Sequence, residues 1–306
     1  MNTTLLLVIA VFLSAATTST KKAAPKTVSA PPPKGSIGVA SDTKCQRLSS
    51  FCLDREDRFL LCDLMKKRLR IVTADDKLVK DYDLDFGPQV VACRTDGTIL
   101  VAGSGKIALL DAQGKKQLEA ALPDSATTAT AVGGNGKDIF VCCMLKTSFA
   151  VSRFDDKLQN PTTIIPGLRG CCGQMDFKVQ GDNIFVAHCT KFKVEKYNRD
   201  GKLLSSFGKR DDGTSQSFKG CCEPKNICFD KDGHLYTAES KAWTVKKFTA
   251  SGAYVNFIGS IAEPGDCVRA AIACTKDNRI FLLDFPRNFI RPVLPGKSKD
   301  VSTSRT

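Results

Sequence analysis

The chain has 306 residues, of which 42% are hydrophobic and 25% charged, and its formal net charge is +13. The length is enough for a sizeable core and the composition is ordinary for a globular protein, which excludes a chain too small or too polar to fold. The net charge is concentrated in the tails, because residues 17–44 and 287–306 each carry five basic residues against one acidic residue. We therefore interpret it as a property of solvated tails; attraction to an anionic polymer or a membrane surface is the alternative.

The first 16 residues are predicted to be a signal peptide. An apolar run from Leu5 to Leu13 is followed by the small residues Ser14, Ala15 and Ala16, and we predict cleavage after Ala16. The run is too short for a membrane span, which needs about 20 apolar residues. One departure from the usual pattern is that no Lys or Arg precedes the run. The sequence thus predicts an exported protein, periplasmic or extracellular.

Two further segments are predicted to be disordered. Residues 17–34 are rich in Thr, Lys, Ala and Pro, which is typical of a basic, Pro-rich tether, and residues 298–306 lack any periodic apolar set. The folded body is predicted to cover residues 35–297.

One phrase recurs along this body: a turn of Asp, Gly or Asn followed by a short β-rich run. The runs begin at residues 59, 99, 139, 184, 235 and 280. Repetition at this interval indicates a solenoid, a propeller or an array. A helical solenoid is not favoured, because the segments alternate with period two and are rich in Val, Ile, Phe and Thr.

Each repeat has room for four strands. In the fifth repeat these are residues 225–228, 235–239, 245–248 and 254–258, separated by turns. Four antiparallel strands per repeat make a propeller blade. We therefore predict an all-β fold, a six-bladed β-propeller of four-stranded antiparallel blades; a pair of β-sandwiches or an open β-solenoid is the alternative.

The sixth repeat has no clear fourth strand, because Pro295, Gly296 and a polar tail follow residues 288–293. Residues 35–40, just before the first repeat, alternate apolar and small side chains. We predict that they supply the missing outer strand, so that the two ends of the body close the ring together.

The segment Gly220-Cys-Cys-Glu-Pro-Lys-Asn-Ile-Cys-Phe-Asp-Lys-Asp-Gly-His-Leu-Tyr-Thr-Ala-Glu239 resembles an NHL repeat. Residues 170–208 and 86–111 match it in the same register, with Pro88 aligned to Pro224, and the resemblance extends over residues 44–297. Paired cysteines at the start of a blade also resemble those of exported bacterial NHL-repeat proteins of unassigned activity. The resemblance implies the propeller fold and leaves function open, because NHL propellers include binding scaffolds and a few enzymes.

The repeat places five of the 14 cysteines at the start of blades four, five and six: Cys171, Cys172, Cys221, Cys222 and Cys267. We predict that they mark a ligand-binding mouth of the channel and that at least three of their sulfurs lie together. Other cysteines fall near the ends of inner-strand runs: Cys52, Cys93, Cys228 and Cys274. Disulfides and small buried thiols, metal or haem-type ligation, and redox chemistry of an adjacent pair are the interpretations left open.

A second set ends each β-rich run, and Gly103 is its member in blade two. Its remaining members are candidate metal ligands: Asp63, Cys143, His188, Glu239 and Asp284. A local hydrogen bond to the following turn is the alternative role. The chain has only two histidines, so it cannot assemble the three-histidine metal site of the amidating lyases among NHL relatives. No Ser-His-Asp order is recognisable either, and no catalytic residue or cofactor is assigned.

A third set is basic and lies on or beside the third strands: Lys66, Lys67, Arg68, Arg70, Lys191, Lys193, Lys196, Lys241, Lys246 and Lys247. Nucleic acid is not favoured as a partner, because the chain is predicted to be exported and Trp243 is the only tryptophan. The leading hypothesis is a non-catalytic exported propeller that binds an unknown protein or small ligand at one channel mouth. The alternative is a metal- or thiol-dependent enzyme of the lyase, lactonase or oxidoreductase type that uses the channel cysteines, His188 and acidic groups.

Overall fold

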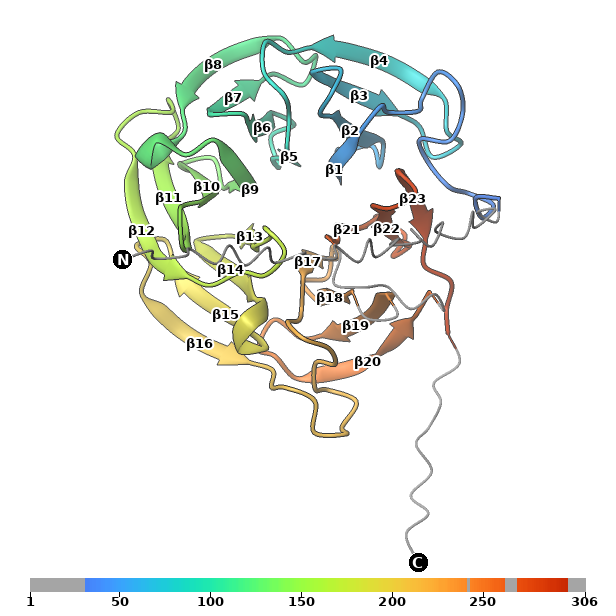
Figure 1. Cartoon of the computed structure of the whole chain (residues 1–306), viewed down its shortest axis with the longest axis vertical. Coiled ribbons are helices and arrows are strands. Elements are labelled where there is room, and N and C mark those ends of the chain that lie inside the picture. The colour runs from blue at the N-terminus through green and yellow to red at the C-terminus, as the bar shows by residue number, and fades with distance from the viewer. Residues whose placement is uncertain (1–30, 241–242, 262–268, 297–306) are drawn as a thin grey trace, which may run out of the picture. The chain divides into compact units, whose positions relative to one another are not determined.

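The computed structural model describes residues 31–240, 243–261 and 269–296. They form six antiparallel sheets that follow one another around a central axis, with the first strand of each sheet innermost (Figure 1). The prediction of an all-β, six-bladed β-propeller is confirmed. Besides strands, the described residues contain two single-turn 3-10 helices, η1 (Pro123–Ser125) and η2 (Cys189–Lys191). No helix in this part of the chain is long and apolar enough to cross a membrane.

The first three blades occupy the N-terminal half of the ring. Blade one contains β1 (Leu48–Leu53), β2 (Phe59–Asp63), β3 (Arg68–Val72) and β4 (Leu78–Asp83). Blade two contains β5 (Val90–Cys93), β6 (Ile99–Gly103), β7 (Lys106–Leu110) and β8 (Lys116–Ala121). Blade three contains β9 (Thr128–Gly134), β10 (Asp138–Met144), β11 (Phe149–Asp155) and β12 (Thr162–Leu168).

The last three blades complete the ring. Blade four contains β13 (Asp176–Gln180), β14 (Asn183–His188), β15 (Lys193–Asn198) and β16 (Leu203–Phe207). Blade five contains β17 (Asn226–Phe229), β18 (Leu235–Glu239), β19 (Thr244–Phe248) and β20 (Tyr254–Gly259). Blade six has three strands among the described residues, β21 (Ile272–Cys274), β22 (Ile280–Asp284) and β23 (Phe289–Pro292). The predicted signal peptide, most of the tether and the predicted tail (298–306) lie outside the described residues.

The second strand of a blade is sandwiched between neighbouring blades. Every residue of β2, β6, β18 and β22 is buried, whereas the outer strand β16 exposes four of its five residues. A strand buried on both faces must be apolar along most of its length. This explains why the runs that begin at residues 59 and 99 are nearly continuous in apolar side chains.

The turns between strands are held by their first residue. The carboxylate of Asp230 accepts hydrogen bonds from the backbone N–H groups of Asp232 and His234, at 3.0 and 2.8 Å. The same bonds, to the residues two and four positions later, are accepted by Asp54, Asp111, Asp155 and Asn198. Asp and Asn favour such turns because their short side chains bond their own backbone.

Polar side chains link neighbouring blades at three junctions near the innermost strands. Asp176 of blade four accepts a hydrogen bond from the N–H of Ile227 in blade five at 2.9 Å. Asn226 of blade five accepts one from the N–H of Ile272 in blade six at 3.0 Å. Gln89 does the same for Ala129 between blades two and three. These bonds satisfy inner-strand amides that face the channel and fix the blades relative to one another.

The segment predicted to close the ring does pair with blade six, but at one isolated bridge and not as a fourth strand. Ile37 pairs antiparallel with Ile290 of β23, with N–H to O distances of 2.8 and 2.9 Å in the two directions. Ile37 is fully buried and packs among side chains of blades one and six. The carboxylate of Asp76 accepts the N–H groups of residues 38, 39 and 40 at 2.7 to 3.0 Å, which attaches the same segment to blade one.

Candidate functional site

The innermost strands surround a channel cavity of about 280 Å³. Lys178 lines it and bonds Asp176 with distances of 2.9 and 3.1 Å. The four inner-strand cysteines also line it: Cys52, Cys93, Cys228 and Cys274. Burial raises the pKa of all four thiols, to about 11 for Cys93 and to about 12 for Cys274. These thiols are therefore neutral near pH 7 and act as small apolar groups in the channel wall.

The cysteines of blade four lie in the loop that opens the blade, residues 169–175. Cys171 to Gln174 form a tight turn in which the N–H of Gln174 donates to the Cys171 carbonyl at 3.1 Å. Its central residues, Cys172 and Gly173, have φ values of 55° and 65°, as a type I′ turn requires. Left-handed backbone costs Cys172 roughly 1 kcal/mol. The Sγ atoms of Cys171 and Cys172 lie 3.5 Å apart.

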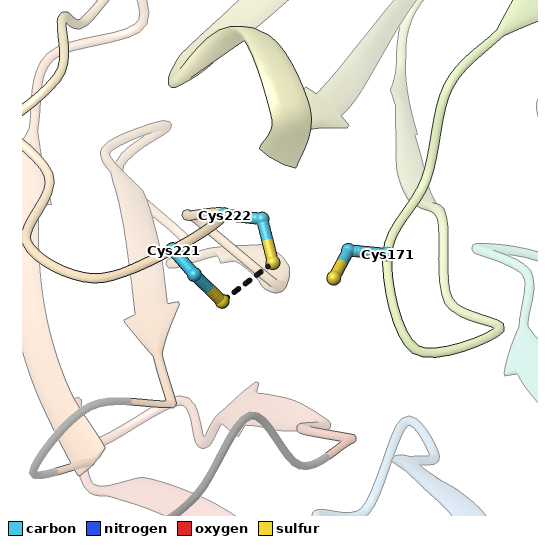
Figure 2. A group of neighbouring side chains, drawn as sticks. All are labelled: Cys171, Cys221 and Cys222. Carbon is cyan, nitrogen blue, oxygen red and sulfur yellow. Dashed lines mark hydrogen bonds between the residues drawn. The ribbon is translucent and has the colours of Figure 1, made fainter.

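The cysteines of blade five lie in the corresponding loop, residues 219–225. The Sγ atoms of Cys221 and Cys222 are 3.1 Å apart. Figure 2 shows both side chains directed towards Cys171 of the neighbouring loop, and the three sulfurs all lie within 4.8 Å of one another. Cys172 and Cys221 are exposed, whereas Cys222 is buried. We call Cys171, Cys172, Cys221 and Cys222 the cysteine cluster.

The prediction that at least three of the five blade-opening sulfurs lie together is thus confirmed by Cys171, Cys221 and Cys222. The fifth predicted member, Cys267, lies outside the described residues. The cluster lies directly before the innermost strands β13 and β17. At this end of the channel the Gln174 side chain bonds the backbone of Ala270 in both directions, at 2.5 and 2.9 Å, and so joins blade four to blade six.

Two buried charged residues beside the cluster were not predicted from the sequence. Lys225 is only 1% exposed, and its Nζ donates to the Sγ of Cys222 at 2.9 Å. Glu223, also 1% exposed, accepts a hydrogen bond from Ser240 at 2.5 Å. Burial raises the pKa of Glu223 to about 7, although Ser240 and the charge of Lys225 oppose that shift. The sequence did contain an indication of Lys225: it is a charged residue at a repeat position where blades two and four have the uncharged residues Gln89 and Met175.

His188 holds the blade-four loop, and both of its ring nitrogens have hydrogen-bond partners. Its Nε2 accepts the backbone N–H of Arg169 at 3.3 Å, two residues before Cys171. Its Nδ1 therefore carries the proton and donates to Glu195 at 2.7 Å. Burial opposes the charge of Glu195, but hydrogen bonds from His188, Tyr197 and Lys191 outweigh it and lower the pKa of this carboxyl to about 2.

Glu239 fixes the loop that opens blade five, as His188 fixes the loop that opens blade four. Its Oε2 accepts the backbone N–H of Lys219 at 2.9 Å, two residues before Cys221. Its Oε1 pairs with the ammonium group of Lys246 at 2.7 Å. The two residues at the ends of these β-rich runs thus position the two loops that carry the cysteine cluster.

The predicted metal set does not converge in the structure. All five candidate ligands are described, and no three of them lie within reach of one ion. Asp63 and Asp284 bond backbone N–H groups of their following turns, those of Lys66 and Arg287, at 3.3 Å. Cys143 is buried in the apolar core between blades two and three, and burial raises its pKa to about 12. Asp63 and Asp284 thus form the local hydrogen bonds to the following turn that were predicted as the alternative role. The geometry does not support a cation shared by the five candidate ligands.

Several other candidate groups have structural partners. The basic residues Arg68, Arg70, Lys246 and Lys247 all form ion pairs with neighbouring carboxylates. A second described group with metal-ligand spacing comprises Asp230, Asp232 and His234. There the Asp230 carboxylate already accepts the turn amides and pairs with Lys247 at 3.1 Å. Unlike the cysteine cluster, which joins two blades, this group lies in the single turn between β17 and β18, and its Asp230 carboxylate is already occupied.

Comparison with known proteins supports the fold and leaves the activity open. No family model matches the sequence, and a search of the curated proteins found no match. Among solved structures, the chain is similar to a streptogramin B lyase, with 13% identity and a TM-score of 0.59 over 81% of this chain and 83% of that one.

Two further structures show the same architecture. A gluconolactonase from Xanthomonas campestris has 16% identity and a TM-score of 0.58, covering 82% of this chain and 87% of that one. The calcium-binding protein regucalcin from Agrobacterium tumefaciens has 14% identity and a TM-score of 0.55, covering 87% and 96%. At such identities the likeness shows the fold alone, that of the six-bladed β-propeller proteins.

Proposed function

We propose that this chain is an exported, NHL-type propeller that binds a ligand or protein partner at the channel mouth that carries the cysteine cluster. The observation that carries the proposal is the convergence of Cys171, Cys221 and Cys222 from two blades within 4.8 Å. Loops on a rigid propeller are where binding residues gather.

The chemistry of the cluster favours a partner that carries a disulfide. Cys221 is exposed, so its sulfur can react with a disulfide of the partner. Cys222 is buried, and the Nζ atom of Lys225 lies 2.9 Å from its sulfur. A cationic donor beside a sulfur stabilises negative charge on that sulfur. The 3.1 Å between the two Sγ atoms is about 1 Å longer than a disulfide bond. Closing this gap also requires a local backbone adjustment, because adjacent Cα atoms are about 3.8 Å apart, closer than is usual in a disulfide.

The exchange proceeds in two displacements. The Cys221 sulfur attacks one sulfur of the partner disulfide, forms a mixed disulfide and releases the other partner sulfur, which takes up a proton. The Cys222 sulfur then attacks Cys221, forms the Cys221–Cys222 disulfide and releases the second partner thiol. Two electrons pass from the protein dithiol to the partner, and the two cysteine protons end on the two partner thiols.

Reaction of the reduced Cys171→Ser/Cys172→Ser variant with 5,5′-dithiobis(2-nitrobenzoate) tests this proposal; all further substitutions in this test are made in this background, because the exposed Cys172 would otherwise react as well. We expect a fast phase that releases about two thiolate equivalents, one for each displacement, and a Cys221–Cys222 disulfide in peptide mass mapping. Cys222→Ser should stop the fast phase after one equivalent, with the reagent retained on Cys221. Cys221→Ser should slow the fast phase at least tenfold.

Cys142→Ser is the matched control. Cys142 and Cys143 are also adjacent, but both are buried in β10 and burial raises their pKa values. This substitution should leave the fast phase unchanged. A fast phase that survives in the Cys221→Ser/Cys222→Ser variant would contradict the proposal.

An oxidoreductase is the second candidate function, and the hydrogen bond from Lys225 to Cys222 favours it. The binding and enzymatic functions differ in turnover. Sustained reduction of oxidised glutathione by catalytic amounts of protein, with a dithiol as the final reductant, would establish the enzyme; a single stoichiometric exchange would establish the binding protein.

Export is tested separately. Expression of the full chain in a bacterial host with intact secretion should yield a mature protein that begins at residue 17 and is recovered outside the cytoplasm. The measurement is the intact mass of the purified protein together with its N-terminal sequence. A cytoplasmic protein that retains residues 1–16 would contradict this part of the proposal.

A further inference from the structure

We propose that the reduced cysteine cluster is also a site for a soft divalent metal ion of the zinc class, with Cys171, Cys221 and Cys222 as ligands. The site goes beyond thiol–disulfide exchange, because it uses the same sulfurs without changing their oxidation state. The exchange reaction and metal binding can therefore be measured independently.

The geometry of the three sulfurs fits one ion. A zinc–sulfur bond is about 2.3 Å, so two sulfurs on a tetrahedral ion stand roughly 3.8 Å apart. The Sγ atoms of Cys171, Cys221 and Cys222 all lie within 4.8 Å of one another, and the shortest separation is 3.1 Å. Figure 2 shows the side chains pointing towards a common centre. Side-chain rotations that move the sulfur atoms by less than about 1 Å complete the site.

The loops that carry these ligands are fixed in advance. His188 and Glu239 bind the backbone two residues before Cys171 and Cys221. The hydroxyl of Thr190 adds a bond of 2.6 Å to the carbonyl of Arg169. Outer-shell bonds of this kind orient metal ligands and raise affinity.

The donor set selects the class of ion. Thiolate sulfur favours zinc and copper(I), whereas magnesium and calcium require oxygen ligands. Three thiolates around a divalent ion leave one excess negative charge, and the buried Lys225 ammonium at 2.9 Å from Cys222 can offset it. A divalent ion suits this charge balance better than a monovalent one.

Cobalt(II) is the spectroscopic probe for the test. Reduced, metal-free protein titrated with Co²⁺ under anaerobic conditions should develop thiolate-to-metal charge-transfer absorption and the visible bands of a tetrahedral complex, saturating at about one equivalent. About one equivalent of Zn²⁺ should then abolish both signals. Ca²⁺ should have no effect.

Variants locate the site. Cys171→Ser, Cys221→Ser and Cys222→Ser should each weaken Co²⁺ binding at least tenfold, whereas Cys142→Ser should bind like the wild type. Lys225→Met should weaken binding while the charge-transfer intensity per bound ion stays constant, and Lys225→Arg should restore part of the affinity. Circular dichroism of each variant checks that the propeller remains folded.

The outcomes separate the two proposals. A folded, reduced wild-type protein that exchanges with a disulfide but shows no Co²⁺ charge transfer would overturn the metal site alone. A protein that binds Co²⁺ but lacks the fast exchange phase would overturn the exchange alone. Charge transfer that persists in the triple serine variant would place the metal elsewhere and overturn this assignment.

Discussion

Replacement of Ile37 by alanine is expected to lower the free energy of unfolding by about 2–5 kcal/mol, the range for truncating a fully buried aliphatic side chain. Ile37 is 0% exposed and pairs with Ile290 where the ring closes. The loss should be near the upper end of that range, because a void at this point loosens blades one and six together. Urea unfolding monitored by circular dichroism measures it.

Val39→Ala is the matched control, because Val39 belongs to the same segment but is 38% exposed; we expect a change within about 0.5 kcal/mol. Deletion of residues 35–43 removes both the pairing with Ile290 and the Asp76 bonds, and should lower the melting temperature by several degrees or abolish folding. An unchanged melting curve would mean that closure does not depend on this segment.

Acid should unfold the wild-type protein partly through Glu195. In the folded state the pKa of this buried carboxyl lies at about 2, against an ordinary value of 4.5. A depressed pKa contributes stability above the ordinary value and loses it as the pH falls through the window between 4.5 and 2. A difference of this size corresponds to about 3 kcal/mol, and more than half should be lost by about pH 3.

The Glu195→Gln variant keeps the size of the side chain and lacks the charge. The stability difference between wild type and variant should therefore be largest near pH 7 and shrink by about 2 kcal/mol at about pH 3. Glu56→Gln is the control, because the Glu56 side chain is 67% exposed. A difference that stays constant with pH would show that the ionisation of Glu195 does not support the fold.

The blades were predictable because their signal is repeated. Each run such as 59–63 or 235–239 is apolar because the strand is buried on both faces, and the turn that precedes the run needs Asp or Asn to bond its own backbone. The closing segment was predictable as well, since the sixth repeat has no clear run of residues that could form a fourth strand. That this segment forms only one bridge, at Ile37, was not predictable. The carboxylate of Asp76 accepts hydrogen bonds from the next three amides, and no local sequence pattern predicts that contact.

The candidate site was predictable only in part. Equivalent repeat positions identified the converging cysteines, because the propeller symmetry places such positions at the same height around the axis. The hydrogen-bond partners of His188 and Glu239 were not predictable in the same way. Both side chains accept a backbone amide of the loop that opens the same blade, Arg169 and Lys219, and not one of the following turn; the sequence of a strand does not show which flanking loop its last side chain faces.

The closure of the ring also sets the order in which the molecule can assemble. Ile37 precedes blade one in the chain and Ile290 lies in blade six, yet each is the hydrogen-bond partner of the other. Blades one to five can form as the chain appears, since each is built from consecutive strands. The buried face of Ile37 stays without its partner until the last blade arrives. The propeller therefore keeps an open edge at blade one until its sixth blade has folded, and only then becomes a closed ring.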